Sequence, residues 1–282
     1  MRLGGPVFVK DLTPDSWIAA LRREKYSAAY SPIGPDHPGA EDTALIAAYR
    51  RAAEKAHILI PEVGAWSNPL SPVAAERKKA LAKCRCALWI ADEIGASSAV
   101  NITGSRGRDW AGPDNKNLTA DTFDRIVAAT RSIIDAVKPK RACYTLEAMS
   151  YMFPDSVDSY LRLIKAIDRK ACAVHFDPVN LVTSPQVYYN TGALIRDFVQ
   201  RLGPKIKSCH AKDILIQNRL TVHLEEARPG LGNLDYPTLV REIHRLNPDL
   251  PLMLEHLPTP QEYKAAAQHI RRVAKRIRVP IH

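Results

Sequence analysis

The sequence predicts an α/β fold, with a single (β/α)8 barrel as its architecture. Two observations support this. Short β-rich runs alternate with longer amphipathic segments eight times along the chain. The length of 282 residues also suits one barrel, which typically takes about 250 residues. Because no shift in composition marks a second domain, we expect one domain over residues 1–282.

Each expected strand is followed by an expected helix. The expected strands are 5–9, 27–33, 58–64, 98–103, 143–149, 171–177, 205–211 and 251–256. The expected helices are 14–24, 41–55, 74–94, 119–138, 156–169, 190–202, 235–246 and 260–277. Cap signals support four helix starts: Thr13 with Pro14, Ser71 with Pro72, Asp155, and Asp235. Strict alternation implies a parallel sheet, and eight such units are the number at which the sheet closes.

The composition is that of an ordinary globular protein, with 46% hydrophobic and 25% charged residues. No apolar run approaches the roughly 20 residues of a membrane helix, and the N-terminus has no secretory signal pattern, so we expect a cytoplasmic protein without a membrane partner. The five cysteines lack zinc-ligand spacing and are interpreted as reduced. The net charge of +10 is dispersed, and its densest run, residues 269–278, is typical of a solvated helix face.

Polar residues lie near the carboxyl ends of the last four expected strands. Glu147, Asp177, His210 and Glu255 come from the fifth to the eighth expected strands, about one βα unit apart. A buried parallel strand is normally apolar, so these side chains need a reason to be there. Since the carboxyl ends of the strands meet at one face of a barrel, we expect the four side chains to converge.

Three carboxylates in a small cavity repel one another unless a positive charge or protons offset them. A divalent metal meets this need. Three oxygen ligands and one imidazole suit Mn²⁺, Mg²⁺, Co²⁺ or Zn²⁺, and ligand type alone does not choose among them. We expect one ion per chain, with Mn²⁺ as the first candidate.

The motifs LEAM, FDPVN, SCHAKD and LEH together resemble the xylose isomerase-like TIM barrel superfamily, in particular its sugar isomerase and epimerase branch typified by D-tagatose 3-epimerase. The resemblance spans the whole chain and implies a metal-dependent enzyme. It implies that Glu147, Asp177, His210 and Glu255 bind one divalent cation. It also implies that Glu147 and Glu255 are the catalytic acid/base pair.

One departure from the family pattern concerns Asn180, which stands where many members have a histidine. An amide can hydrogen-bond a hydroxyl group but cannot act as a base. His175 lies two residues before Asp177 and therefore points to the same side of the strand, either to contact substrate or to serve as a buried support. The remaining candidates for substrate contact, each with local packing or solvent exposure as the alternative, are Lys212, Glu62, Trp66, Trp110 and Arg106.

These residues predict a sugar epimerase or isomerase acting on a small carbohydrate. One glutamate removes the proton next to a carbonyl, a metal-stabilised enediolate forms, and the other glutamate returns the proton. A dehydratase or lyase acting on a keto-sugar or keto-glycoside is the alternative. An AP-endonuclease-like phosphodiesterase and a non-catalytic sugar-binding subunit are more remote, because a single-metal site is expected and the ligand set is complete. We do not expect nucleic acid as a partner, and a homo-oligomer stays open.

Overall fold

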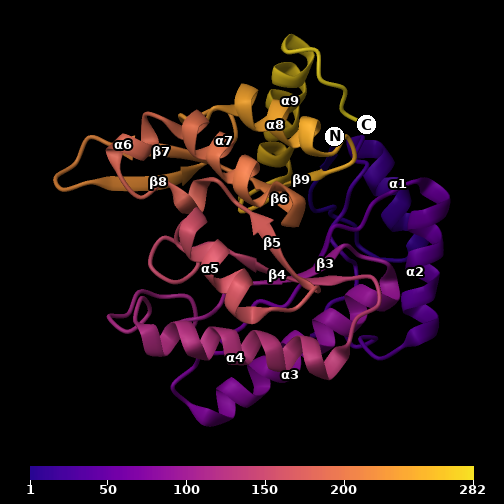
Figure 1. Ribbon diagram of the computed structural model, residues 1–282. Coiled ribbons are helices and arrows are strands. Elements are labelled where there is room, and N and C mark those ends of the chain that lie inside the picture. The colour runs from indigo at the N-terminus through magenta and orange to yellow at the C-terminus, as the bar shows by residue number, and fades with distance from the viewer.

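Seven parallel strands form one curled sheet in the computed structural model, which describes residues 1–282 (Figure 1). Their order across the sheet is β1-β9-β6-β5-β4-β3-β2. The strands are β1 (Arg2–Gly4), β2 (Glu62–Gly64), β3 (Ser98–Asn101), β4 (Cys143–Glu147), β5 (Cys172–Phe176), β6 (Ile206–Ala211) and β9 (Pro251–Leu254). The chain thus has an α/β fold whose late strands, β4, β5, β6 and β9, lie side by side.

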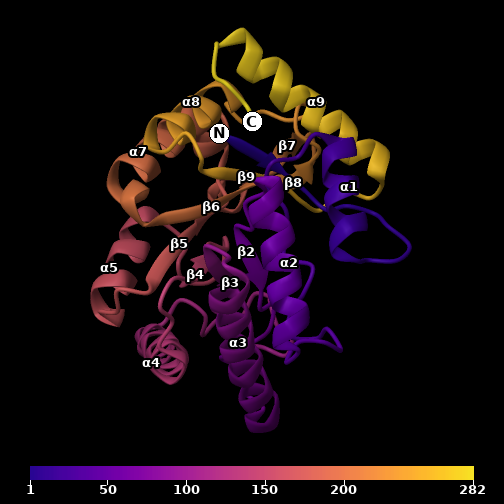
Figure 2. The same ribbon diagram turned by 90° about the vertical axis from the view of Figure 1, so that its right-hand side faces the viewer.

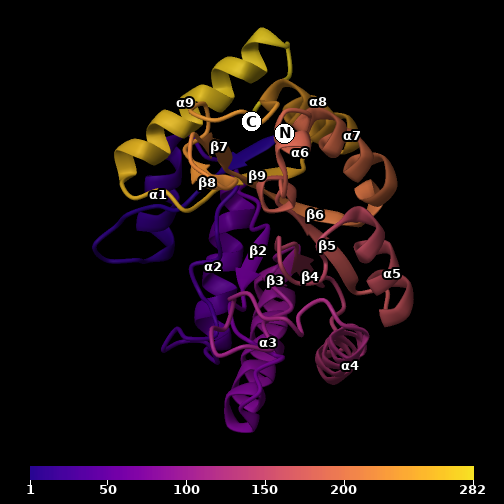
Figure 3. The same cartoon turned by 90° about the vertical axis from the view of Figure 1, so that its left-hand side faces the viewer.

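Helices cover the outer face of this sheet (Figures 2 and 3). They are α1 (Pro14–Glu24), α2 (Thr43–Ala56), α3 (Ala74–Ile94), α4 (Ala120–Val137), α5 (Val157–Ile167), α6 (Pro185–Tyr188), α7 (Thr191–Leu202), α8 (Tyr236–Leu246) and α9 (Pro260–Arg276), with 3₁₀ turns at Val179–Leu181 and Gly203–Lys205. The two chain ends meet, since the Met1 ammonium donates to the Pro280 carbonyl over 2.8 Å. No helix is both long enough and apolar enough to cross a membrane.

The prediction of a first strand at residues 5–9 is wrong. The strand lies earlier, at Arg2–Gly4, and residues 5–9 have no regular structure. Pro6 lacks the N–H that a strand would use for pairing, and its ring lines a cavity instead. The apolar run GPVFV therefore reflects the rim of a cavity and not a strand.

The second expected strand, residues 27–33, forms only single bridges. Ala28 is bridged to Gly4 on one side and to Leu59 on the other, both in the parallel sense. Pro32 has no N–H for pairing, and the Ser31 hydroxyl donates to the Ile33 carbonyl over 2.6 Å. The segment lies between the two edges of the sheet, but it is not a regular strand.

A hairpin that the sequence analysis did not predict projects from the sheet (Figure 1). Strands β7 (Asp213–Gln217) and β8 (His223–Ala227) pair in antiparallel fashion within residues 212–234, between the expected strand 205–211 and the expected helix 235–246. The hairpin follows β6 directly, and it carries Glu226 back towards the sheet.

Two of the four helix caps follow the prediction. Thr13 accepts a hydrogen bond from the Ser16 amide, and Asp235 accepts one from the Thr238 amide. The other two predictions are wrong. Helix α3 has Val73 at its N-cap position without a side-chain cap, and the Ser71 hydroxyl accepts from the Val73 amide, before the helix begins. Helix α5 is capped by Ser156 and not by its neighbour Asp155.

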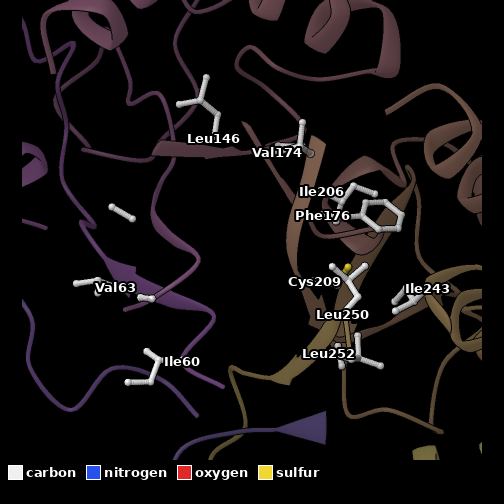
Figure 4. Packing of buried hydrophobic residues seen from close by; sticks show 14 of the residues in the cluster. Ile60, Val63, Leu146, Val174, Phe176, Ile206, Cys209, Ile243, Leu250 and Leu252 are labelled. Atoms are coloured by element: carbon white, nitrogen blue, oxygen red, sulfur yellow. The ribbon is translucent and has the colours of Figure 1, made fainter. Parts of the chain in front are cut away.

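Side chains of β5 alternate between the two faces of the sheet. Phe176 stacks on Phe198 of α7, with ring centroids 4.1 Å apart, so it packs on the helix side. Figure 4 shows Phe176 on the same side of the strands as Ile243 of α8. The neighbouring residues His175 and Asp177 point to the opposite, inner face, as their two-residue spacing requires.

Asp92, near the end of α3, fixes the start of β4. Its carboxylate accepts backbone N–H bonds from Lys140, Arg141 and Ala142 over 3.0, 2.6 and 2.8 Å. Burial raises the pKa of this carboxyl, but the three backbone donors outweigh that effect and lower it. The residue therefore stabilises the strand that carries Glu147.

Replacing Asp92 with asparagine is expected to lower the free energy of unfolding by about 2 kcal/mol at neutral pH, because one amide oxygen replaces a charged acceptor. Because the pKa of Asp92 is lower in the folded protein than in the unfolded chain, where it is about 4, the ionised carboxylate stabilises the fold at neutral pH. This stabilisation is lost as the pH falls through the pKa of the folded protein. Urea unfolding of both proteins at pH 7 and pH 3 measures the difference. An equal difference at both pH values would contradict this role.

Candidate active site

The four residues predicted at the late strand ends meet on the inner face of the sheet. Their ligand atoms all lie within 4.8 Å of one another. Nδ1 of His210 is 2.9 Å from Glu255, 3.2 Å from Glu147 and 4.0 Å from the Asp177 carboxylate. Glu147 ends β4, Asp177 follows β5, His210 lies within β6, and Glu255 follows β9. The parallel topology thus places one polar side chain from each of four neighbouring strands in one cluster.

The charges in this cluster shift the pKa values in opposite directions. Burial raises the pKa of Asp177 to about 6, against the opposing effect of Lys212. Burial also opposes ionisation of Glu147 and Glu255, but the charge of His210 outweighs it and lowers both pKa values. The two glutamates are therefore ionised near neutral pH.

Two buried carboxylate oxygens in the cluster have no hydrogen-bond partner. They are Oδ2 of Asp177 and Oε1 of Glu255. The Lys212 ammonium lies 2.9 and 2.6 Å from them, so it offsets their charge without hydrogen-bond geometry. Buried carboxylate oxygens without a hydrogen bond are costly, and three oxygens with one imidazole nitrogen are a suitable donor set for a divalent cation. The residues present thus fit such an ion.

Glu62 and His175 lie behind this cluster and do not line the cavity in front of it. Oε1 of Glu62 is 3.1 Å from Nε2 of His210, and its Oε2 is 3.3 Å from Nδ1 of His175. His175 is fully buried, and its Nδ1 is 2.5 Å from the Ser208 hydroxyl. Glu62 thus contacts the Nε2 side of the His210 ring and His175 contacts Glu62, whereas Nδ1 of His210 faces Glu147, Asp177 and Glu255.

Replacing Glu62 with glutamine is expected to weaken binding of a divalent metal by about 10- to 100-fold, because carboxylate partners of metal-binding histidines orient the ring and raise its basicity. Isothermal titration with Mn²⁺ measures this change. Glu93→Gln, an exposed glutamate on α3, is the matched control and should bind as the unaltered protein does. Equal affinity in all three proteins would refute the supporting role of Glu62.

A cavity of about 610 Å³ opens over the cluster. Four of the predicted substrate contacts line it: Trp66, Trp110, Asn180 and Lys212. Asn180 also donates a hydrogen bond from Nδ2 to the Glu147 carboxylate over 3.1 Å. The other lining residues are Pro6, Tyr30, Ile102, Ala111, Glu147, Met149, Glu226, Glu255, His256 and Tyr263.

Arg106 is not brought to this cavity. Its guanidinium lies 2.6 Å from the Asp121 carboxylate and donates to the Thr122 hydroxyl over 3.0 Å, at the first turn of α4. These contacts connect Arg106, in the loop after β3, to α4, and Arg106 does not line the cavity.

Sequence reasoning missed Tyr30, Tyr263, Glu226 and His256 at the cavity. Glu226 lies 3.1 Å from the Lys212 ammonium and 3.0 Å from Nδ1 of His256. His256 adopts a left-handed backbone, with φ at 55°, which is unusual outside glycine. The alternating run TVHLE, residues 221–225, is a signal that could have identified the strand of Glu226, but nothing in the sequence shows that this strand turns back over the cavity.

A comparison with family models gives one match. Residues 26–273 match the model of the xylose isomerase-like TIM barrel family. The chain belongs to this family. The match spans the strands of all four clustered residues, so membership of the xylose isomerase-like TIM barrel family confirms the resemblance that their motifs indicated. A comparison with curated proteins gives no match.

Solved structures of similar fold agree with the xylose isomerase-like assignment. D-psicose 3-epimerase from Clostridium cellulolyticum H10, with D-tagatose, has a TM-score of 0.69 and 14% identity, over 97% of this chain and 99% of that one. The 3-keto-D-glucoside 4-epimerase from E. coli, in its apo form, has a TM-score of 0.67 and 13% identity, over 96% and 99%. The probable 3-DHS dehydratase of petrobactin synthesis from Bacillus anthracis has a TM-score of 0.69 and 13% identity, over 96% and 98%. At these identities the likeness concerns the fold.

Proposed function

We propose that this protein is a metal-dependent sugar epimerase or isomerase that transfers a proton at a carbon next to a carbonyl. The observation that carries the proposal is the cluster of Glu147, Asp177, His210 and Glu255, in which two ionised glutamates line a cavity of about 610 Å³. One divalent ion, with Mn²⁺ as the first candidate, would be held by these four residues. The epimerases among the structures of similar fold support this choice.

We also propose that residues 27–33 complete an eight-stranded barrel. Hydrogen bonds support this: the Ser27 amide donates to Leu3 over 3.0 Å, and the Ala29 amide donates to Leu59 over 2.9 Å. The segment would thus link β1 to the chain before β2, and the clustered residues would lie at the mouth of a closed barrel.

The two glutamates divide the proton transfer between them. Glu147 and Glu255 come from strands β4 and β9, which are separated in the sheet by β5 and β6, so they approach a bound sugar from different sides. One carboxylate accepts the proton from the carbon and afterwards releases it to solvent, and the other takes up a proton from solvent and delivers it to the opposite face. A divalent ion held by the four clustered residues would supply positive charge that makes a C–H group next to a carbonyl more acidic. Asn180 holds Glu147 in position through its amide.

A dehydratase is the second candidate. Lys212 favours it, because its ammonium lies 2.6 Å from Glu255 and 3.1 Å from Glu226 at the cavity wall. A third group that can hold a proton suits the departure of a hydroxyl group as water. The dehydratase among the structures of similar fold agrees with this possibility.

Deuterium exchange distinguishes these proposals. The Mn²⁺-loaded protein is incubated in D₂O with ketohexoses and with 3-keto-glucosides, and the products are followed by NMR. An epimerase or isomerase incorporates deuterium at carbon and keeps the composition of the sugar, whereas a dehydratase releases an enone. If no candidate exchanges and none loses water, the proposed proton transfer is wrong for these substrate classes.

A further inference from the structure

Two tryptophans form the cavity wall on the side of β2 and β3. Trp66 follows β2 and is 37% exposed, and Trp110 lies in the loop after β3 and is 46% exposed. Both line the same cavity as Glu147 and Glu255, which belong to later strands. Large aromatic side chains left open to a cavity favour contact with an apolar or ring-shaped ligand group.

The position of Trp66 is fixed by the glycine that ends β2. A Cβ on Gly64 would lie 2.5 Å from Nε1 of Trp66, so the indole occupies the space that a side chain would fill. The ring is therefore packed directly against the backbone of β2. Any other residue at position 64 would displace it.

The loops that carry the two tryptophans are tied together. Asn68, 8% exposed, donates from Nδ2 to the Ser105 carbonyl over 2.8 Å and so joins the loop after β2 to the loop after β3. The Ser105 amide donates to the Trp110 carbonyl over 3.1 Å. Asn117 is fully buried and donates to the Gly112 carbonyl over 3.1 Å. Hydrogen bonds from buried amide groups thus hold the two loops, and with them Trp66 and Trp110, in place.

The cavity offers no free cation to a negatively charged substrate. Lys212 and His256 are the cationic or protonatable basic groups that line it, and both are paired with Glu226, which is not one of the four proposed metal ligands. Three lining glutamates, Glu147, Glu226 and Glu255, add negative charge. Phosphate and carboxylate groups are usually held by arginine, lysine or free backbone N–H groups. The lining therefore favours an uncharged ligand.

The cavity is larger than one sugar ring needs. A water molecule takes about 30 Å³, so 610 Å³ corresponds to about 20 waters. A hexose has about twelve non-hydrogen atoms, each of which takes less room than a water. A second ring fits beside the first.

We propose that the substrate is an uncharged keto-glycoside, whose sugar ring lies over the clustered carboxylates and whose second ring packs against Trp66 and Trp110. The keto group in this description rests on the proposed function. The aromatic subsite and the preference for an uncharged ligand rest on the cavity wall alone, and are tested with ligands that do not react.

Isothermal titration of the Mn²⁺-loaded protein compares three such ligands: phenyl β-D-glucoside, glucose and glucose 6-phosphate. We expect phenyl β-D-glucoside to bind about tenfold more tightly than glucose, because its second ring gains an aromatic contact. Glucose 6-phosphate should bind no better than glucose. Trp66→Ala and Trp110→Ala should each remove most of the advantage of the phenyl glycoside.

Two further variants test whether a loss of binding is caused by misfolding. Gly64→Ala keeps both indoles but displaces that of Trp66, and it should reduce phenyl glucoside binding and leave glucose binding unchanged. Trp89→Phe, on α3 and outside the cavity, is the control and should bind all three ligands as the unaltered protein does.

Equal affinity for phenyl β-D-glucoside and glucose would overturn the subsite, as would retention of the preference in both alanine variants. Tighter binding of glucose 6-phosphate than of the phenyl glycoside would overturn the uncharged substrate, even if deuterium exchange is seen. Conversely, the expected ligand preference without any deuterium exchange would support the subsite and refute the proposed proton transfer.

Discussion

Replacing Glu147 with glutamine is expected to lower kcat of the Mn²⁺-loaded protein by about 10³-fold, because an amide cannot accept the proton that the carboxylate removes or returns. Glu255→Gln should cause a loss of the same order. Steady-state rates with the substrate identified by deuterium exchange measure both changes. The exposed Glu93→Gln variant, which touches no part of the cavity, is the control for a lost negative charge.

Metal content must be measured in the same samples, since both glutamates are also proposed ligands. A Glu147→Gln variant that retains one ion per chain and loses activity separates the proton-transfer role from the metal role. Rates within threefold of the unaltered protein in either variant, with metal bound, would contradict the role of that glutamate.

Replacing Asp177 with asparagine is expected to weaken Mn²⁺ binding by at least 100-fold. The residue contributes a buried carboxylate oxygen, Oδ2, that has no hydrogen-bond partner in the protein, and asparagine removes its charge. Its other oxygen accepts the Val179 amide over 2.9 Å, and asparagine can keep that bond, so the local backbone should persist. Isothermal titration gives the affinity, and circular dichroism shows whether the fold is retained.

The same carboxyl gives the metal affinity a pH dependence. Burial raises the pKa of Asp177 to about 6 in the metal-free protein, and a metal ligand must be deprotonated. Mn²⁺ binding should therefore weaken as the pH falls below 6. In Asp177→Asn this part of the dependence should be absent. Full affinity in the variant, or a pH profile identical to that of the unaltered protein, would show that Asp177 is not a ligand.

The late strands were predictable because their sequence pattern is unambiguous. Each is a short run with an acidic residue or a histidine near its carboxyl end, and the carboxyl ends of neighbouring parallel strands lie at the same edge of a sheet. Glu147, Asp177, His210 and Glu255 therefore followed from the sequence before any contact was known. The family match over residues 26–273 agrees with this interpretation.

The early strands were less predictable because proline and cavity-lining residues interrupt them. The apolar runs at 5–9 and 27–33 look like strands, but Pro6 and Pro32 cannot donate to a ladder. Hydrophobicity alone does not distinguish a residue that packs in the core from one that lines a cavity.

The depth of a side chain below the cavity was also beyond sequence reasoning. Glu62 and His175 point inwards as predicted, but both lie one layer beneath the cluster, where they support His210. Direction follows from the two-residue period of a strand, whereas depth follows from the stagger between neighbouring strands. The position of Glu226 at the cavity depends on the β7–β8 hairpin. The Glu226 side chain contacts Lys212 and His256, which are distant from it in the sequence, so the sequence pattern alone does not indicate this position.

Anomalous diffraction from crystals soaked in Mn²⁺ tests the metal centre most directly. We expect one peak in each chain, at about 2.0–2.3 Å from atoms of Glu147, Asp177, His210 and Glu255. We expect no peak between Glu62 and His175, because we assign these residues to the support of His210. The absence of any peak at the four residues, or a cluster of two or three ions that includes Glu62 and His175, would contradict a single metal centre.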